Sequence, residues 1–299
     1  MDVVPSRLAE LHGGKGSTPW LMMLVKPEIG GGRLTASDLD TVDVPQAATA
    51  LRVSGLDQTS FEALISRWGT RFSAIEFWKC PRVADLSPLE DLPQLRLVSF
   101  YWNQRATRLW DLRKTPQLTG LHLYNFTRLH DLSDLAAATS LIELEVGDSV
   151  WDTSVFDSLE PLSRLTNLRS LTLSAKKITD GRVEPLAALQ KLTSLTFSAK
   201  QFTTEQVAWL RAHLPASLQS EALEPLRRFS PPLQGSSKPV DALLVGRRKP
   251  FLNSVDDHAR IATHIERFEA LVAQFRANPS LPPEHGLVKP PPAEPDLAG

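Results

Sequence analysis

The sequence predicts an α/β solenoid, in which a curved parallel β-sheet carries short helices on its convex side and a C-terminal amphipathic helix follows. Three observations support this prediction. A hydrophobic pattern recurs every 23 residues, short apolar-polar-apolar stretches lie at fixed points within it, and a helical apolar stripe follows a Pro-, Gly- and Ser-rich break. One such unit has too small an apolar side to form a core, so neighbouring units must stack to bury it.

The bulk composition fits a globular chain with a large core. The chain has 299 residues, of which 42% are hydrophobic and 22% charged, with a formal net charge of −1. This balance gives no global attraction to nucleic acid or to an anionic membrane. The short basic run at 246–249 has no interleaved aromatic residues, so we interpret it as a solvated loop. We therefore expect no nucleic-acid partner and no membrane association.

Residues 1–45 are expected to form an N-terminal cap region. The apolar run from Trp20 to Val25 is too short for a membrane span, and no small-residue cleavage pattern flanks it. We interpret this run as a strand at the start of the array. The absence of a signal-peptide pattern favours a cytoplasmic protein, although secretion without a cleaved signal would leave the same sequence. The single cysteine, Cys80, fits a reducing compartment.

The repeats occupy residues 46–215 and number about seven. Ile75, Val98 and Leu121 begin three consecutive units, and later residues in each unit keep the same offsets. The stretches "FSAIEFWKC" (72–80) and "LRLVSFYWN" (95–103) carry the pattern L-x-x-L-x-L-x-x-(N/C). This pattern resembles the leucine-rich-repeat superfamily, and in particular its short bacterial, internalin-like type. The resemblance implies a curved parallel sheet and a role in binding other proteins.

The convex segments are expected to be short helices. Thr59 with Glu62, and Thr203 with Gln206, have the spacing of capping boxes. Cys80 lies at an inward position of the repeat, where a buried thiol is inert, so we interpret it as structural.

The concave face can be read from the sequence, because side chains between the inward leucines must point to the other side of the sheet. Units two to four place Trp78, Tyr101 and Tyr124 in one column, whereas the last two units present only Ser and Thr. Exposed aromatic residues in a row are typical of a binding surface, although cross-strand aromatic pairs can also simply stabilise a sheet.

Charged and apolar residues beside this column complete the predicted site. A four-residue insertion between Ser149 and Leu159 places a loop next to the aromatic column. The predicted partner-binding residues are Trp78, Tyr101, Tyr124, Trp151, Glu76, His122, Glu145, Asp148, Leu97 and Trp102. Trp102 has a second interpretation, in which its ring turns back into the core.

Catalysis is not expected. His122 and Glu145 are neighbours in one column, but a cross-strand ion pair explains them without chemistry. The "GGKGST" stretch (13–18) lacks the Lys-Ser/Thr step of a phosphate loop. Leucine-rich-repeat ubiquitin ligases need a catalytic Cys in an appended domain, and no Cys follows residue 80. We predict no cofactor and no metal site, and we keep a substrate-recognition role in an enzyme-like effector only as a lesser alternative.

The C-terminal part is predicted to contain a linker at 216–250, a helix at 251–277 and a disordered Pro-rich tail at 278–299. Ser254 and Asp257 have capping-box spacing. An apolar stripe then follows at helical intervals through Ile261, Ile265, Phe268, Val272 and Phe275. The stripe has three possible partners: the last repeat, a second copy of the chain, or another protein's groove. The second option makes the chain a self-associating scaffold.

Overall fold

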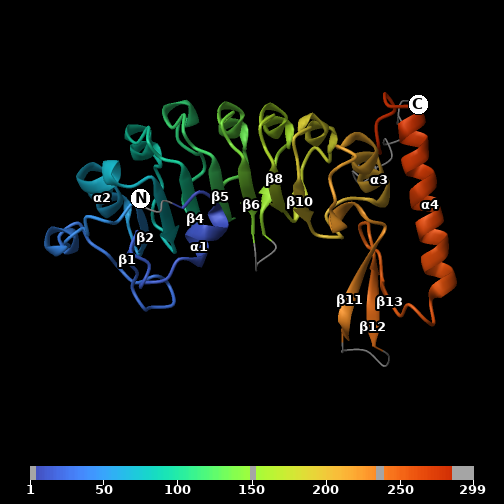
Figure 1. Cartoon of the computed structure of the whole chain (residues 1–299), viewed down its shortest axis with the longest axis horizontal. Helices are drawn as coiled ribbons and strands as arrows, with labels where there is room; N and C mark the ends of the chain where they lie inside the picture. The colour runs from blue at the N-terminus through green and yellow to red at the C-terminus, as the bar shows by residue number, and fades with distance from the viewer. Residues whose placement is uncertain (1–4, 149–152, 234–238, 285–299) are drawn as a thin grey trace, which may run out of the picture.

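The computed structural model describes residues 5–148, 153–233 and 239–284. Its main feature is a parallel sheet of eight strands in the order β1-β2-β3-β4-β5-β6-β8-β10, which Figure 1 shows as an arc with turns along its outer side. The strands are β1 (Leu21–Leu24), β2 (Ala50–Ser54), β3 (Ala74–Trp78), β4 (Leu97–Asn103), β5 (Gly120–Phe126), β6 (Glu143–Gly147), β8 (Ser170–Ser174) and β10 (Ser194–Phe197). The predicted α/β solenoid is confirmed.

The register of the sheet follows the repeat. Ile75 pairs with Val98, and Val98 with Leu121, so that residues at one offset of the repeat lie side by side. These three residues have no exposed surface, and one continuous core runs from β1 to the C-terminal helix. The Asn103 side chain donates to the Cys80 and Val83 carbonyls and accepts from two backbone N–H groups, as the consensus polar position of the repeat requires.

The convex side differs from the predicted row of helices. Within the described residues, its α-helices are α2 (Gln58–Trp68), which η2 (Gly69–Arg71) continues as a 3-10 turn, and α3 (Thr204–His213). The convex segments of the repeats between them are 3-10 turns. They are η3 (Ser87–Asp91), η4 (Leu112–Lys114), η5 (Ser133–Ala137), η6 (Glu160–Arg164) and η7 (Glu184–Ala188). Leu86, Leu89 and Leu92 explain the difference, because a 3-10 helix has three residues per turn and so directs residues three apart to the same side.

Of the two capping boxes predicted within the repeats, one is confirmed and one is wrong. Thr203 and Gln206 form the box that opens α3. At α2 the box is made by Asp57 and Ser60, because the helix begins at Gln58. Asp57 is two residues before the Thr59 that the spacing indicated.

The predicted linker at 216–250 is a folded module. It contains η8 (Glu221–Leu223) and strands β11 (Leu226–Leu233) and β12 (Val240–Leu244), which with β13 (Phe251–Leu252) form an antiparallel sheet. Figure 1 shows this sheet projecting from the last repeat. Ser230, Pro231 and Pro232, part of the stretch that suggested a linker, lie in β11, while Ala242 and Leu244 form the module's own small core with Ile261.

The C-terminal helix α4 (His258–Ala277) begins later than predicted, because 251–252 form β13. The proposed Ser254–Asp257 capping box is wrong, since the Ser254 hydroxyl donates to Asp241 and Asp257 makes no side-chain cap. The apolar stripe of α4 packs against α3, with Phe268, Val272 and Phe275 joining the main core.

Part of the predicted disordered tail is also packed. Trp209 on α3 donates its indole N–H to the Leu281 carbonyl. Residues 285–299 lie outside the described residues.

Two short strands, β7 (Val155–Phe156) and β9 (Lys177–Ile178), pair beside the main sheet. Strand β7 lies within the interval 149–159, where the repeat spacing located the insertion, and β9 lies in the next repeat.

Candidate functional site

The N-terminal segment crosses the concave face, which the sequence pattern did not indicate. Helix α1 (Leu8–Gly13) contacts strands β3, β4 and β5, and Figure 1 shows it lying over these strands. Leu11 is fully buried and packs with the small side chains of Ala50 and Ala74 and with Leu97. This cluster is separate from the solenoid core, because it lies on the opposite side of the sheet.

Gly120 continues the floor under α1. A Cβ atom added at Gly120 would lie 2.6 Å from Leu97 Cδ2 and 3.1 Å from Leu8 Cγ, so a side chain at this position would have to displace Leu97 and crowd Leu8. We call the surface formed by Ala50, Ala74, Leu97 and Gly120 the α1 groove. Leu97, predicted to bind a partner, is instead covered by the chain itself, with 1% of its surface exposed.

The C-terminal end of α1 is held by Arg52. The Arg52 guanidinium donates to the carbonyls of Leu11, His12 and Gly14 at 3.0–3.1 Å. The same guanidinium pairs with the Glu76 carboxylate at 2.8 Å. Burial raises the pKa of Glu76, and the Arg52 charge opposes that rise. Glu76, a predicted partner-binding residue, is therefore the buried counter-ion of Arg52.

Two histidines share one hydroxyl under α1. His12 Nε2 lies 3.0 Å from Ser99 Oγ, and His122 Nδ1 lies 2.9 Å from the same oxygen. The two imidazole rings meet edge to face with centroids 4.8 Å apart. Burial, with a smaller contribution from His12, lowers the pKa of His122 to about 3, so the ring is neutral at pH 7.

The expected ion pair between His122 and Glu145 is not formed in this state. His122 Nε2 is 3.8 Å from Glu145 Oε2, which is too long for a hydrogen bond, and the imidazole is uncharged. Burial and the nearby Glu143 raise the pKa of Glu145. Glu145 keeps a third of its side chain exposed and stays on the surface available to a partner.

Ser99, His122 and Glu145 stand in the order of a nucleophile, a base and an acid, but the geometry argues against that chemistry. Ser99 has no exposed surface, and the lowered pKa leaves His122 a weak base at neutral pH. The thiol of Cys80 is equally unsuited, because burial raises its pKa to about 12. The part of the chain that the structure describes contains no group of three or more His, Cys, Asp or Glu placed to hold a metal ion.

The aromatic column remains accessible beside α1. Trp78, Tyr101 and Tyr124 are each half-buried, and we call them the aromatic strip. The rings of Trp78 and Tyr101 stack with centroids 4.8 Å apart and an interplanar angle of 16°. Tyr124 lies against His122, with a centroid distance of 4.3 Å, so the strip adjoins the α1 groove. Burial, with Glu145 and Asp148, raises the pKa of Tyr124 to about 12, and its hydroxyl stays protonated.

The backbone turns sharply where this edge of the sheet ends. Lys79, Trp102 and Asn125 occupy one position in successive repeats, and all three have positive φ angles of 55–67°. Such angles are uncommon for residues other than glycine and concentrate at functional sites. Trp102 is half-exposed there, so its ring does not turn back into the core, and it remains a candidate contact.

The loop before β2 borders the strip at Trp78. Lys79 Nζ lies 5.2 Å from the Trp78 ring centroid and donates to the Ile29 carbonyl at 2.8 Å. Ile29 is 90% exposed, and sequence reasoning missed it because it stands outside the repeat. The Ile29 backbone thus lies beside Lys79 at the Trp78 end of the aromatic strip, and its apolar side chain is exposed.

Asp148, at the start of the insertion loop, has a different role from the partner contact that was predicted for it. Asp148 is 4% exposed, and its carboxylate accepts from the Thr153 and Ser154 N–H groups at 2.7 and 2.8 Å. Asp148 therefore holds the loop rather than facing a partner. Trp151, the other predicted residue of this loop, lies outside the described residues.

The far end of the concave face is bare and polar. Strands β8 and β10 present the serine–threonine face, which consists of Ser170, Thr172, Ser174, Ser194, Thr196 and Ser198. A hollow of about 330 Å³ opens where this face meets Arg7 and Glu143 at the start of α1. The face has no aromatic or apolar anchor.

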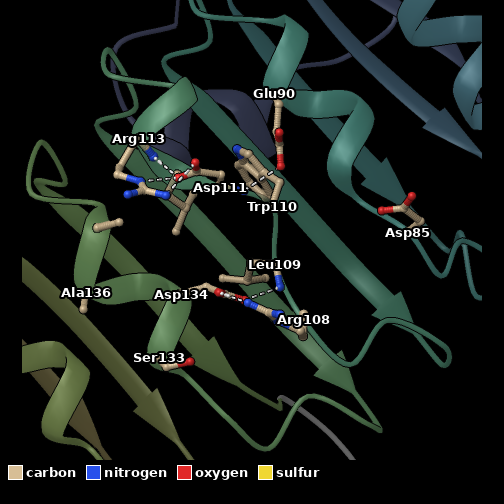
Figure 2. A pocket seen from close by; sticks show the side chains of 12 residues that line it. Asp85, Glu90, Arg108, Leu109, Trp110, Asp111, Arg113, Ser133, Asp134 and Ala136 are labelled. Atoms are coloured by element: carbon tan, nitrogen blue, oxygen red, sulfur yellow. Dashed lines mark hydrogen bonds and ion pairs between the residues drawn. The ribbon is translucent and has the colours of Figure 1, made fainter.

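A larger hollow, of about 650 Å³, lies on the convex side, where η4 is shorter than its neighbours. Figure 2 shows its charges pairing with one another: Arg108 with Asp134, and Arg113 with Asp111. Trp110 is buried beneath it and donates to the Thr115 hydroxyl. Because the two arginines in Figure 2 are paired within the hollow, we do not treat it as the site.

Comparisons with known proteins give structural likeness only. No family model matches the chain, and no curated protein matches it. Among solved structures, an internalin of Listeria monocytogenes is 21% identical with a TM-score of 0.46, and the match covers 64% of this chain and 49% of the internalin. A leucine-rich-repeat protein of Leptospira interrogans is 13% identical with a TM-score of 0.42, over 74% of this chain and 58% of that one.

A third match is to the Drosophila Toll–Spatzle complex, at 18% identity and a TM-score of 0.42, over 62% of this chain and 25% of that one. The present chain thus spans between a quarter and about three fifths of the length of these proteins. What decides the fold is the chain's own 23-residue repeat, its parallel strands in register and the hydrogen bonds of Asn103 at the consensus polar position. The chain has the leucine-rich-repeat fold.

The structure divides the predicted site residues that it describes into three sets by their accessibility. The aromatic strip and Glu145 are accessible, Glu76, Leu97 and His122 lie beneath α1, and Asp148 supports a loop. None of the helices within 5–148, 153–233 and 239–284 has the length and hydrophobicity of a membrane span.

Proposed function

We propose that this leucine-rich-repeat protein is a non-enzymatic binding module that holds a protein or peptide against the aromatic strip. The observation that carries the proposal is the row of Trp78, Tyr101 and Tyr124, half-exposed on a rigid sheet at the edge that α1 leaves open. Aromatic residues dominate interface energetics because they bring large area at low entropic cost. We also propose a cytoplasmic location, which the single reduced and buried Cys80 fits.

The surroundings of the strip set the chemistry of the partner. Phe77 and Phe100 stack directly behind it in the core, with centroids 4.4 Å apart, so the sheet beneath the strip is firmly packed. Lys79 and Ile29 lie at one end and Glu145 at the other. A peptide with apolar side chains over the rings and a basic group toward Glu145 would suit this surface.

The structure offers less support for the alternative of a self-associating scaffold. The apolar stripe of α4 already packs on α3, where Arg211 reaches Glu269 at 3.0 Å. A second copy would have to displace these contacts. We therefore place the binding surface on the sheet and assign α4 to the end of the solenoid.

The test is selection of binding peptides from a displayed random library on the full chain, followed by calorimetry of the enriched peptides. We expect Trp78→Ala/Tyr101→Ala/Tyr124→Ala to lose at least about thirtyfold in affinity, since one lost anchor is worth about 2 kcal/mol. The matched control is Thr172→Ala/Ser174→Ala/Ser198→Ala on the serine–threonine face, which should bind normally. Urea unfolding verifies that both variants are folded. Enriched peptides that bind the aromatic variant as well as wild type would overturn the proposal.

A further inference from the structure

Helix α1 occupies the concave face in the way that a ligand would. Its buried contacts lie in a cluster separate from the solenoid core, so the repeats do not depend on it for their own packing. It has six residues and no side-chain N-cap, and a helix of that length has little stability of its own. Its conformation is therefore imposed by the surface on which it lies.

The surface beneath α1 has the composition of a recognition site. An element whose only purpose was to cover a sheet would need no more than the apolar floor of the α1 groove, but α1 also covers the neighbouring column of Arg52, Glu76, Ser99 and His122. Burying an Arg–Glu pair is costly unless the remaining donors find partners. Arg52 meets that need by donating to three carbonyls at the end of α1, as in the capture of a helix C-terminus.

The contacts in the α1 groove also indicate which kind of segment can bind there. Gly120 admits Leu8, while Ala50 and Ala74 admit Leu11, and these leucines are three residues apart on one side of the helix. Beyond the groove, Glu143 accepts from the Leu8 N–H at 2.9 Å. The site thus accepts a short helical turn with leucines at i and i+3, a bonded N–H at its start and free carbonyls at its end.

We propose that α1 is an intramolecular ligand, and that a partner's short helical segment with leucines at i and i+3 takes its place in the α1 groove. This inference rests on the proposed function, because it assigns the partner class to the same concave face. His122 links the two parts, since its ring contacts both His12 of α1 and Tyr124 of the aromatic strip. A partner bound to the strip is therefore separated from α1 by the His122 ring alone.

The link between α1 and β1 suits displacement. Residues 14–20 connect the helix to β1; they include Gly14 and Gly16, and none of them belongs to the solenoid core. A tethered α1 competes with any partner at an effective concentration in the millimolar range for a short flexible linker. Only a partner with additional contacts, such as those on the aromatic strip, would compete well with α1 in the wild-type chain.

The experiment uses a fluorescein-labelled synthetic peptide of residues 5–17 as the probe and measures its anisotropy with full-length protein. The recipient is a Leu8→Ser/Leu11→Ser variant, whose own helix no longer fills the groove. We expect this variant to bind the probe at least tenfold more tightly than wild type. A probe carrying the same two Ser substitutions should not bind, and Arg52→Ala in the recipient should weaken binding by tenfold or more. Equal binding to wild type and variant would overturn the inference.

A second variant keeps the inference testable if the serine variant fails to fold. A protease recognition sequence inserted between Gly16 and Ser17 of the full chain allows α1 to be cut from the folded protein. We expect the cut segment to exchange with the labelled probe while the melting transition of the remainder persists. Unfolding on cleavage, or no exchange over a day, would show that α1 is a fixed part of the fold. Neither result depends on the aromatic strip, so failure here is distinguishable from failure of the proposed function.

Discussion

Strands β3–β5 and strands β8–β10 share one buried pattern but present opposite kinds of concave face. Inward positions such as Leu121 and Leu171 are fully buried in both regions. On the concave side, the first region carries Arg52 from the adjacent strand β2, Glu76, His122 and the aromatic strip, and α1 covers part of it. The second region carries short hydroxyl side chains and remains bare. Because the inward positions are buried equally in both regions, core packing does not explain the difference, which is the difference expected if the proposed binding surface lies on β3–β5.

Substitutions in the column that contains Arg52 and Thr172 are expected to show the largest difference in stability between the two regions. Arg52→Ala would leave the Glu76 carboxylate buried without a counter-ion and release three carbonyls of the α1 segment. The free energy of unfolding should fall by about 3–5 kcal/mol, measured by urea denaturation. Thr172→Ala, in the same column on β8, should change it by less than about 0.5 kcal/mol. The double variant Arg52→Ala/Glu76→Ala should recover much of the loss, and similar losses at Arg52 and Thr172 would contradict the account.

A bulky residue in the groove floor should give the next effect. Gly120→Val would drive its side chain into Leu97 and Leu8, and overpacking of this kind costs about 1–3 kcal/mol. Ser170→Val occupies the corresponding position on β8, where no helix lies above, and should be close to neutral. Proteolysis at Arg7 under native conditions reports the release of α1 in the first variant. Faster cleavage in Ser170→Val than in Gly120→Val would refute this placement of α1.

The lowered pKa values of the two histidines under α1 predict that the protein loses stability as the pH falls. His122 has a pKa lowered to about 3, so its contribution to stability is complete above its unfolded pKa of about 6.5 and is lost as the pH falls toward 3. The pKa of His12 is lowered too, by burial and then by Arg52. Each neutral histidine can cost up to about 1.4 kcal/mol per pH unit in that window. Glu76 and Glu145 have raised pKa values and oppose this loss at lower pH.

Urea denaturation at pH 7 and pH 5 therefore isolates the histidine contribution. We expect wild-type stability to fall on acidification, and His122→Asn to fall less, because the amide does not titrate. The Arg and Glu groups around α1, namely Arg7, Glu10, Arg52 and Glu143, are common to both proteins. A parallel decline of wild type and variant would remove His122 from the explanation.

The smallest expected effect belongs to the exposed end of α1. Arg7 pairs with Glu143 at 2.7 Å, but two thirds of the Arg7 side chain is exposed. Arg7→Ala should therefore lower stability by less than about 1 kcal/mol, and salt should reduce the difference further. Measurements in 0.05 and 0.5 M NaCl verify the trend. A loss as large as that of Arg52→Ala would mean that α1 is anchored at its start rather than at its end.

The repeat and its core were predictable because stacking forces every unit to bury the same offsets, as Ile75, Val98 and Leu121 do. The aromatic strip was predictable for the same reason, since the alternation that buries Phe77 exposes Trp78 in part. The position of α1 over Glu76, Leu97 and His122 could not be predicted. Leu8 and Leu11 form too short an apolar pattern to show which distant strands they contact. The β11–β13 module escaped prediction because its prolines lie at the end of a strand and resemble a linker.

The most direct test of the central claim is amide hydrogen exchange of the full chain with and without a saturating library-selected peptide. We predict added protection at the ends of β3, β4 and β5, near Trp78, Tyr101 and Tyr124, and faster exchange in residues 8–14 as the peptide displaces α1. Exchange at β8 and β10 should stay unchanged. Protection confined to the convex turns or to α4, with residues 8–14 unaffected, would contradict the account.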